Sequence, residues 1–227
     1  MAFRHDESLT FPTLKQHNLP IGRVYMVESG EHKGEVYPSI TRVLAAKPKP
    51  ALEAWKKRVG KAEAARVSQR ATVQGGNVHR VVECYLNNRA LPAYGPNVAE
   101  LWKQLKPWLD QNITKVYAQE QDLCSHKLKV AGRTDILAEV LGRRAVVDVK
   151  TSLREKREDW VEDYLLQATF YSLAAYEATK VPFKRIVIPI VHPTGLQVFE
   201  ASPMDYASTL VKRINEFYES YEKGLDF

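Results

Sequence analysis

The spacing of apolar residues changes near residue 110 and divides the chain into two parts. In the first part apolar residues recur at intervals near 3.6, the period of a helix that buries one face. This spacing predicts three helices, at residues 51–68, 76–87 and 96–110. In the second part apolar residues alternate or run together, which predicts three consecutive strands, at residues 115–123, 128–140 and 144–150.

Shorter signals complete the expected order of elements. Ser39 can cap a short helix that ends at Leu44, after a small hairpin formed by residues 23–27 and 35–38. The last three elements are an amphipathic helix, a hairpin and a helix, at residues 159–179, 185–200 and 202 onward. The expected fold class is α/β or α+β, with a mixed sheet flanked by helices in a single domain over residues 1–227. We expect residues 1–110 to be mainly helical and residues 111–227 to hold the sheet.

Net charge and cysteine content restrict the functional class. There are 33 Lys and Arg against 27 Asp and Glu, a net charge of +6, which suits a polyanionic partner without requiring one. No apolar run approaches the roughly 20 residues of a membrane helix, and the N-terminus lacks a signal-peptide pattern, so we expect a soluble intracellular protein with no membrane association. Two cysteines exclude a disulfide framework, a four-thiolate zinc site and a cysteine-ligated iron–sulfur cluster.

The most informative chemistry lies in the segments around Asp135 and Asp148. Alternate residues of a strand share a face, so Asp148 and Lys150 are expected to point the same way, and Asp135 on the preceding strand can reach the same end of the sheet. Two carboxylates with a backbone carbonyl and waters make a site for Mg²⁺ or Mn²⁺. Lys150 could orient a water or stabilise transition-state charge. The alternative is an exposed cluster of opposite charges.

Three further features favour the catalytic interpretation. His79 follows Gly75 and Gly76 at the expected start of a helix, where it could be a metal ligand or a solvated histidine. Glu120 lies on the strand before Asp135, as a further ligand or as a surface glutamate. Gln167 and Tyr171 are four residues apart on one helix, so they share a face and could hold a phosphate or Lys150; alternatively, they belong to an ordinary amphipathic helix.

The order of these short motifs resembles one enzyme family. Gly75 with His79, Gly132 with Asp135, Asp148 with Lys150, and Gln167 with Tyr171 resemble the RecB-like branch of the PD-(D/E)xK nucleases. Within that branch the chain is similar to the mitochondrial genome maintenance exonucleases and related phage exonucleases, because residues 37–44 and 52–57 are similar to their N-terminal part. The resemblance covers residues 37–171.

The resemblance implies a metal-dependent DNA exonuclease that degrades DNA from free ends. In this family pattern His79, Asp135, Asp148 and the Val149 carbonyl bind Mg²⁺ or Mn²⁺, and Lys150 is the catalytic lysine. Gln167 and Tyr171 would support the site, and Glu120 would be a further catalytic carboxylate. Some relatives carry four cysteines for an iron–sulfur cluster; Cys84 and Cys124 cannot supply one, and we interpret both as small buried residues.

Basic residues before His79 are the expected DNA contacts. Cations neutralise phosphates, and an exposed Trp55 could stack on a base, although burial of Trp55 in the core is the stronger expectation. The expected contacts are Lys47, Lys49, Trp55, Lys56, Lys57, Arg58, Lys61, Arg66, Arg70, Thr151, Ser152 and Arg154. A helical arch over the site would admit single-stranded DNA with a free end.

Two alternatives keep the fold and change the function. One is an endonuclease with the same metal site, and the other is a non-catalytic nucleic-acid-binding protein that assists recombination. The paired acids and lysine favour a nuclease, since carboxylates repel phosphate and serve no purpose in a binding module. Replication or recombination proteins are possible partners, and we expect a bacterial or phage-infected cytoplasm rather than the mitochondrial matrix.

Overall fold

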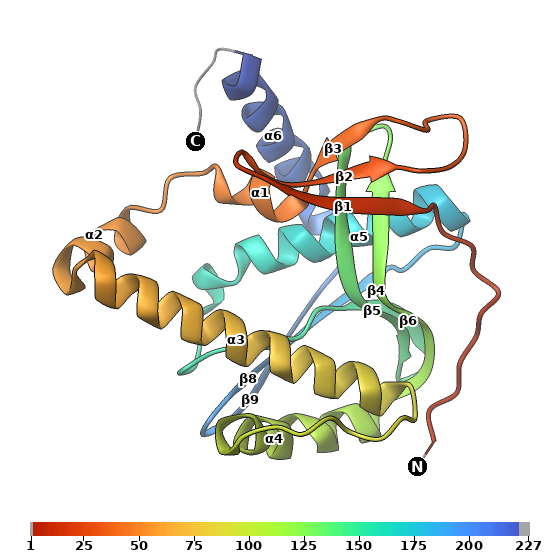
Figure 1. The fold of residues 1–227 in the computed structure, drawn as a ribbon. Helices are drawn as coiled ribbons and strands as arrows, with labels where there is room; N and C mark the ends of the chain where they lie inside the picture. Colours follow the sequence, from red (N-terminus) through yellow and green to blue (C-terminus); the bar gives the residue numbers. More distant parts are fainter. Residues whose placement is uncertain (1, 223–227) are drawn as a thin grey trace.

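The centre of the molecule is a six-stranded mixed sheet, shown in Figure 1 of the computed structural model, which describes residues 2–222. Its strands are β4 (Ile113–Ser125), β5 (Val130–Val140), β6 (Arg143–Val147), β7 (Lys150–Thr151), β8 (Arg185–His192) and β9 (Gly195–Ala201). β4, β5 and β6 pair antiparallel in chain order, which confirms the three consecutive strands. β8 pairs parallel with β6, and β9 returns antiparallel on β8 as the predicted hairpin.

An interruption in the predicted strand 144–150 separates β6 from β7. Both strands pair with β8 at the same offset, since Ala145 lies opposite Arg185 and Lys150 lies opposite Ile190. β7 therefore continues the line of β6 along β8, and residues 148 and 149 lie between the two strands. The chain stays attached to the sheet here, because the backbone N–H of Asp148 donates to Val187 O at 3.0 Å.

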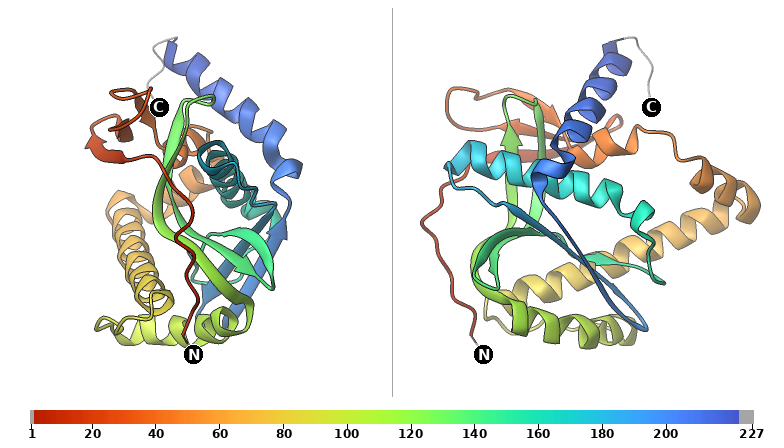
Figure 2. Two further views of the ribbon diagram at one scale, coloured as in Figure 1. Left: turned by 90° about the vertical axis from the view of Figure 1, so that its right-hand side faces the viewer. Right: turned by 180° about the vertical axis from the view of Figure 1, so that it is seen from behind.

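Helices cover both faces of this sheet, and each face has its own apolar core (Figure 2). One face is covered by α1 (Ile40–Ala45), α5 (Glu162–Thr179) and α6 (Pro203–Glu222), the other by α3 (Lys61–Leu86) and α4 (Pro96–Asn112). Alternate strand residues point to opposite faces, so Val146 joins the first core and Val147 the second. This arrangement confirms the expected fold class.

A second, three-stranded sheet is formed near the N-terminus. β2 (Gly22–Val27) and β3 (Val36–Pro38) are the predicted hairpin, and β1 (Leu14–Leu19) pairs antiparallel with β2. The hydrophobic pattern does not indicate β1, because Leu14 is its one buried residue. Tyr25 and Tyr37 contribute to a small core with Cys124 and Ala131, which joins this sheet to β4 and β5.

Glycines interrupt the N-terminal helices differently from the prediction. α2 (Pro50–Val59) and α3 are separated at Gly60, whose φ of +85° favours glycine, so one helix over residues 51–68 is wrong. A helix start at Gly76 is also wrong, because Gly75 and Gly76 lie inside the continuous α3. Each glycine costs a helix about 1 kcal/mol relative to alanine. The buried residues Val78, Val81, Val82 and Leu86 of α3 offset that cost.

The other predicted helices are confirmed with small changes. α1 begins at the Ser39 cap, whose Oγ accepts a hydrogen bond from the N–H of Arg42 at 3.2 Å. α5 begins after a 3₁₀ turn (Glu158–Trp160) and is buried on most sides rather than amphipathic, because α6 covers the side that faces away from the sheet. No helix among the described residues is both long enough and apolar enough to cross a membrane.

Candidate active site

Three carboxylates occupy a row across neighbouring strands. The register of β4 on β5 places Glu120 opposite Asp135, and the register of β5 on β6 places Asp135 opposite Asp148. Glu120 has a φ of +46°, an uncommon backbone conformation for a residue other than glycine. The structure therefore brings together the three acids that the sequence singled out, two of them at the point where β6 ends.

Asp135 and Asp148 are fixed at this point in different ways. Asp135 Oδ2 accepts a hydrogen bond from the backbone N–H of Val149 at 2.8 Å, so the interruption between β6 and β7 is stabilised by Asp135 itself. Asp148 is fully buried, and its Oδ2 lies 2.6 Å from Lys150 Nζ. Its Oδ1 has no hydrogen-bond partner among the described residues. A buried carboxylate oxygen without a partner is costly unless a cation occupies the position beside it.

His79 reaches the same place from the middle of α3. Its Nδ1 lies 3.5 Å from Asp135 Oδ2 and 3.8 Å from Glu120 Oε1. One donor atom from each of the three residues lies within 4.8 Å of the others. The negative charge of Asp135 raises the pKa of His79 to about 9, and burial raises the pKa of Asp135 to about 6. The neighbouring acids therefore favour a positive charge at His79, whereas burial disfavours the negative charge of Asp135.

Lys150 connects the acids to α5. Burial alone would lower the pKa of Lys150, but the charges of Asp148 and Asp135 outweigh that effect and raise it. Its Nζ donates to Gln167 Oε1 at 3.3 Å, and Gln167 Nε2 donates to the hydroxyl of Tyr171 at 2.9 Å. The four polar groups therefore form one chain from the carboxylates to the buried Tyr171.

The donor set suits a divalent cation. Glu120 and Asp135 supply carboxylate oxygens and His79 supplies an imidazole nitrogen, a combination that binds Mg²⁺ or Mn²⁺. Asp148 lies beside this group without belonging to it, close enough for its charge to raise the pKa of Asp135 further. The unpartnered Oδ1 of Asp148 is the observation that such an ion accounts for. The N–H of Val149 is already used by Asp135, and its carbonyl is the group expected to face the ion.

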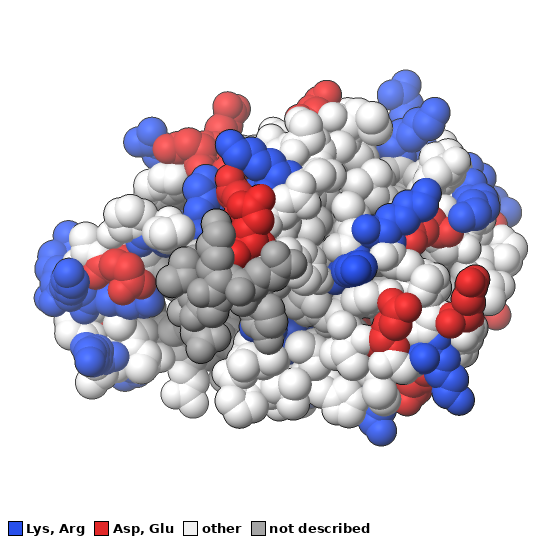
Figure 3. Space-filling view, turned by 90° about the horizontal axis from the view of Figure 1, so that it is seen from above, with Lys and Arg blue, Asp and Glu red and all other residues white. Residues whose placement is uncertain are grey.

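The basic residues before His79 form two groups in the structure. Lys47 and Lys49, in the connection between α1 and α2, pair with Glu162 and Asp163 of α5 at 3.8 and 2.7 Å. The remaining ones are exposed on α2 and α3: Lys56, Lys57, Arg58, Lys61, Arg66 and Arg70. Figure 3 shows one group of Lys and Arg at the left end of the molecule and further groups on the right. Lys56 and Arg66 also contact Glu53 and Glu63.

Trp55 is half-buried on α2, a helix that has no buried residue, so the expectation that it belongs to the core is wrong. The apolar spacing of α2 is misleading, because α2 does not pack on the central sheet and none of its residues is buried. Arg66 and Arg70 line a groove of about 460 Å³ between α3 and the start of α4, with Gln69 and Asn77 beside them. Polar and cationic side chains thus border a groove on the surface of α3.

Two aromatic residues near Lys150 escape the sequence analysis. The Tyr164 ring centroid lies 5.3 Å from Lys150 Nζ. Trp160 is exposed, and the side chains of Arg154, Lys156 and Arg157 lie within 5.8 Å of its ring centroid. An aromatic residue three positions after the basic run 154–157 is the signal that could have identified Trp160. Thr151 and Ser152 lie at the start of this loop, half-buried, and Ser152 Oγ donates to Arg154 O at 2.6 Å.

The cysteines lie apart from this site. Cys124 is buried as expected, and burial raises its pKa to about 12, whereas Cys84 is only partly buried.

Comparison with known proteins identifies the class that this fold and site define. The sequence profile of the PD-(D/E)XK nuclease superfamily matches residues 40–224, and the chain belongs to that superfamily. Its members are metal-dependent nucleases, so divalent metal binding, phosphodiester hydrolysis and a DNA substrate follow at that level. No curated protein matches the chain. A solved structure titled "Crystal structure of SSO0001" is similar, with 13% identity, a TM-score of 0.44, and coverage of 80% of this chain and 74% of that one.

Proposed function

We propose that the protein is an exonuclease that degrades single-stranded DNA from free ends, in the RecB-like branch of its superfamily. One structural feature supports this proposal: the connection before α2, α2 itself and α3 form a loop of backbone (the circuit) that leaves α5 and returns to β7 beside the candidate site (Figure 1). The ion pairs of Lys47 and Lys49 attach the connection before α2 to the first turn of α5. α2 then projects beyond the sheet (Figures 1 and 2), and α3 returns to the sheet at β7.

The return of α3 to β7 is close. Gly75 faces Thr151, whose Oγ1 would lie 3.5 Å from a Cβ added at Gly75. His79 lies one turn further along α3, Lys150 precedes Thr151 on β7, and Gln167 lies on α5. The candidate catalytic residues therefore border the circuit from three sides. A DNA strand that reaches these residues by passing through the circuit needs a free end. Single-stranded DNA is narrower than duplex DNA and is therefore the form expected to pass.

Each residue of the site has a role in hydrolysis. His79, Glu120, Asp135, Asp148 and the Val149 carbonyl would hold one or more divalent ions, which would polarise the phosphodiester and lower the pKa of a water. Lys150, close to Asp148, is positioned to orient the attacking water or to stabilise charge on the phosphate as the ester bond breaks. Gln167 holds the Lys150 ammonium by a hydrogen bond, and Tyr171 fixes Gln167 in turn.

Charge and aromatic residues along the circuit support a single-stranded substrate. The exposed cations of α2 and α3 can contact successive phosphates, and Thr151, Ser152 and Arg154, which follow Lys150 in the chain, can contact the DNA backbone beside the site. Trp160, surrounded by cations, and Trp55, half-buried on α2, offer ring faces on which bases can stack without regard to sequence. Stacking of this kind needs unpaired bases, which favours a single strand over a duplex.

The test compares linear with covalently closed circular single-stranded DNA, each in Mg²⁺, Mn²⁺ or EDTA. We expect the linear strand to be degraded progressively from an end in the presence of metal, and the circle to survive. Asp148→Asn protein purified in parallel is the control for contaminating nuclease. Rapid cleavage of the circle by the wild type alone would overturn the exonuclease proposal and favour an endonuclease. Binding of both forms without any metal-dependent cleavage would favour the non-catalytic alternative.

A further inference from the structure

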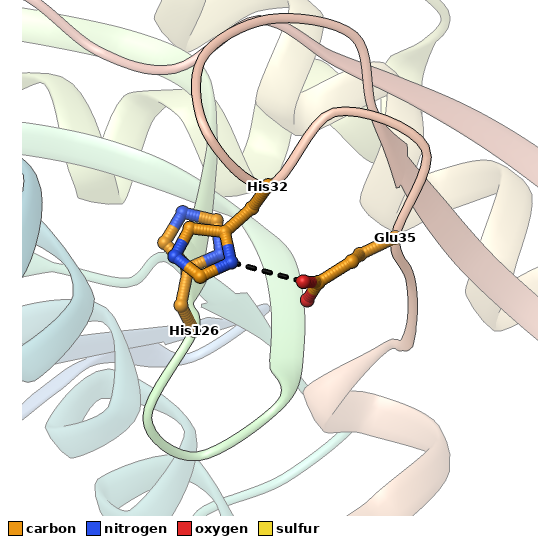
Figure 4. A group of neighbouring side chains, drawn as sticks. All are labelled: His32, Glu35 and His126. Atoms are coloured by element: carbon orange, nitrogen blue, oxygen red, sulfur yellow. Dashed lines mark hydrogen bonds and ion pairs between the residues drawn. The ribbon is translucent and has the colours of Figure 1, made fainter.

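A second group of metal-binding side chains lies outside the candidate active site. His32 and Glu35 belong to the loop between β2 and β3, and His126 belongs to the turn between β4 and β5 (Figure 4). The loop and the turn are about 90 residues apart in sequence and come from different sheets. Nothing in the proposed nuclease reaction uses these three residues.

The donor atoms of this group converge. One donor atom from each residue lies within 4.8 Å of the others, and His32 Nδ1 lies 3.0 Å from Glu35 Oε1. The two imidazole rings are stacked, with centroids 3.8 Å apart and an interplanar angle of 15°. An imidazole nitrogen binds a metal in the plane of its ring, so the two rings must turn out of the stack for both to hold one ion.

The Tyr37 hydroxyl lies beside the cluster. It contacts Glu35 Oε2 and also lies 2.9 Å from His126 Nδ1. A hydroxyl can donate its proton to the carboxylate and accept one from the imidazole, so these three groups can satisfy one another as a hydrogen-bonded network. An ion bound at His126 Nδ1 would replace the contact with Tyr37 and would place the ring proton on Nε2, which lies 3.7 Å from Cys124 Sγ.

The turn that carries His126 is rigidly held. Glu177 of α5 accepts hydrogen bonds from the backbone N–H of His126 at 2.9 Å and from the hydroxyl of Ser125 at 2.6 Å. His126 is thus presented by the nuclease sheet, while His32 and Glu35 come from a loop whose side chains are partly exposed. A ligand shared between them would fasten the N-terminal sheet to β4 and β5, the strands that carry Glu120 and Asp135.

We propose that His32, Glu35 and His126 form a site for a transition-metal ion of the Zn²⁺ type. Two imidazoles and one carboxylate, with water as a fourth ligand, are a ligand set that Zn²⁺ accepts, whereas Mg²⁺ prefers oxygen ligands alone. Ligands of a tetrahedral Zn²⁺ at about 2.1 Å lie about 3.4 Å from each other, so binding requires the donor atoms to move slightly closer and the His32 and His126 side chains to rotate. The ion has a structural role, as a clip between the two sheets.

The test measures Zn²⁺ bound per chain by equilibrium dialysis of the full-length protein in millimolar Mg²⁺. The proteins compared are wild type, the cluster variants His32→Ala and His126→Ala, and His17→Ala as the matched histidine control on β1. His32→Ala changes only a partly exposed loop. We expect wild type and His17→Ala to bind one Zn²⁺ more per chain than either cluster variant. His79→Ala, which alters the nuclease site, should still bind the Zn²⁺ held by His32, Glu35 and His126. Glu35→Gln is expected to bind Zn²⁺ more weakly.

Two further measurements separate a metal clip from other causes. Co²⁺ bound by wild type should show the intense visible absorption of a four-coordinate ion, absent from His32→Ala and His126→Ala. Zn²⁺ should raise the Tm of wild type and of His17→Ala by more than that of the cluster variants, in which only the nuclease site can still bind the ion. Mg²⁺-dependent cleavage should persist in His32→Ala, since this residue lies outside the nuclease site. Equal Zn²⁺ stoichiometry in wild type and both histidine variants would show that the cluster is only a hydrogen-bonding network.

Discussion

Asp148 joins two properties that folded proteins rarely combine. Its carboxylate is fully buried, and Oδ1 accepts no hydrogen bond from the described residues. Lys150 compensates one oxygen at 2.6 Å, and Asp135, a second acid, lies opposite in the sheet. Burial of such a set costs several kcal/mol unless a cation offsets it. Lys150 needs only one acid as its ion-pair partner. A bound metal ion would explain why Asp135 lies beside Asp148 as a second acid.

The first prediction concerns the acid and lysine pair. Asp148→Asn and Lys150→Ala should each reduce the rate of DNA cleavage by at least about 10²–10³-fold, because each removes a charge that acts on the reacting phosphate or its metal. Cleavage of an end-labelled strand in Mg²⁺ measures this, with circular dichroism as the check on folding. Asp159→Asn and Lys127→Ala, both exposed, are the matched controls. Near-wild-type cleavage by either site variant would remove that residue from the mechanism.

The second prediction concerns His79. His79→Ala should weaken Mn²⁺ binding by at least about tenfold and should affect Mg²⁺ less, since imidazole is a softer ligand that suits Mn²⁺ better than Mg²⁺. Calorimetric titration of both ions into wild type, His79→Ala and His17→Ala measures the difference. If wild type and His79→Ala bind Mn²⁺ with equal affinity, His79 is not a metal ligand and only lies near the carboxylates.

Part of this site was predictable from residue spacing. Asp135, Asp148 and Lys150 were predictable because strand alternation and adjacent strands place them together. His79 was correctly associated with the acids but wrongly placed at a helix start, since two glycines are also compatible with a continuous helix. The left-handed conformation of Glu120 has no local sequence signal, because positions with positive φ usually carry glycine or asparagine.

At the scale of elements, close approach explains the two glycine positions that matter most. A Cβ at Gly132 of β5 would lie 3.0 Å from both Ile40 Cγ2 and Tyr171 Cε1, two buried side chains. A Cβ added at Gly75 of α3 would instead lie 3.5 Å from Thr151 Oγ1, an ordinary van der Waals distance. Gly132 therefore lets α1 and α5 pack onto the sheet beside the site, whereas Gly75 leaves room for a methyl group.

The third prediction uses this contrast. Gly132→Ala should lower the free energy of unfolding by about 1–3 kcal/mol through overpacking, and should also slow cleavage because Tyr171 fixes Gln167. Gly76→Ala, in open space on the same helix as His79, should instead stabilise the protein by up to about 1 kcal/mol. Urea unfolding with EDTA present measures both. Equal stability of Gly132→Ala and wild type would mean that the packing of α1 and α5 is more adaptable than the distances indicate.

Strands were easier to predict than the helical boundaries in this chain. β4, β5 and β6 carry long alternating or apolar runs, whereas β1 buries one leucine and α5 is buried on most sides, so neither shows the expected periodicity. The division of one helix into α2 and α3 depends on the positive φ of Gly60, a conformation that glycine permits but does not require. Glycine alone therefore does not distinguish a break such as Gly60 from a position inside a helix such as Gly75, which lies beside Thr151 of β7.

At the scale of the whole molecule, the distribution of charge matters more than its sum. The net charge of +6 is small, but the exposed cations of α2 and the first half of α3 form one group at one end (Figure 3), on the circuit beside the site. α2 buries no residue, so its sequence is free to serve the surface rather than the core. A strand that passes through the circuit would meet these cations before it reaches Lys150.

The fourth prediction follows from this arrangement. Replacing Lys56, Lys57 and Lys61 together with Gln should weaken binding of single-stranded DNA and reduce the slope of log affinity against log salt by up to about 2, at roughly 0.7 for each phosphate that is no longer neutralised. Binding is measured in Ca²⁺ or EDTA at several salt concentrations. A triple variant of Lys103, Lys180 and Lys212, exposed elsewhere on the surface, carries the same change in net charge. If both triple variants show the same reduction in slope, the attraction comes from net charge alone. If the slope falls only in the α2 and α3 variant while its Mn²⁺ affinity is unchanged, the phosphates follow this end of the molecule on their way to the metal site.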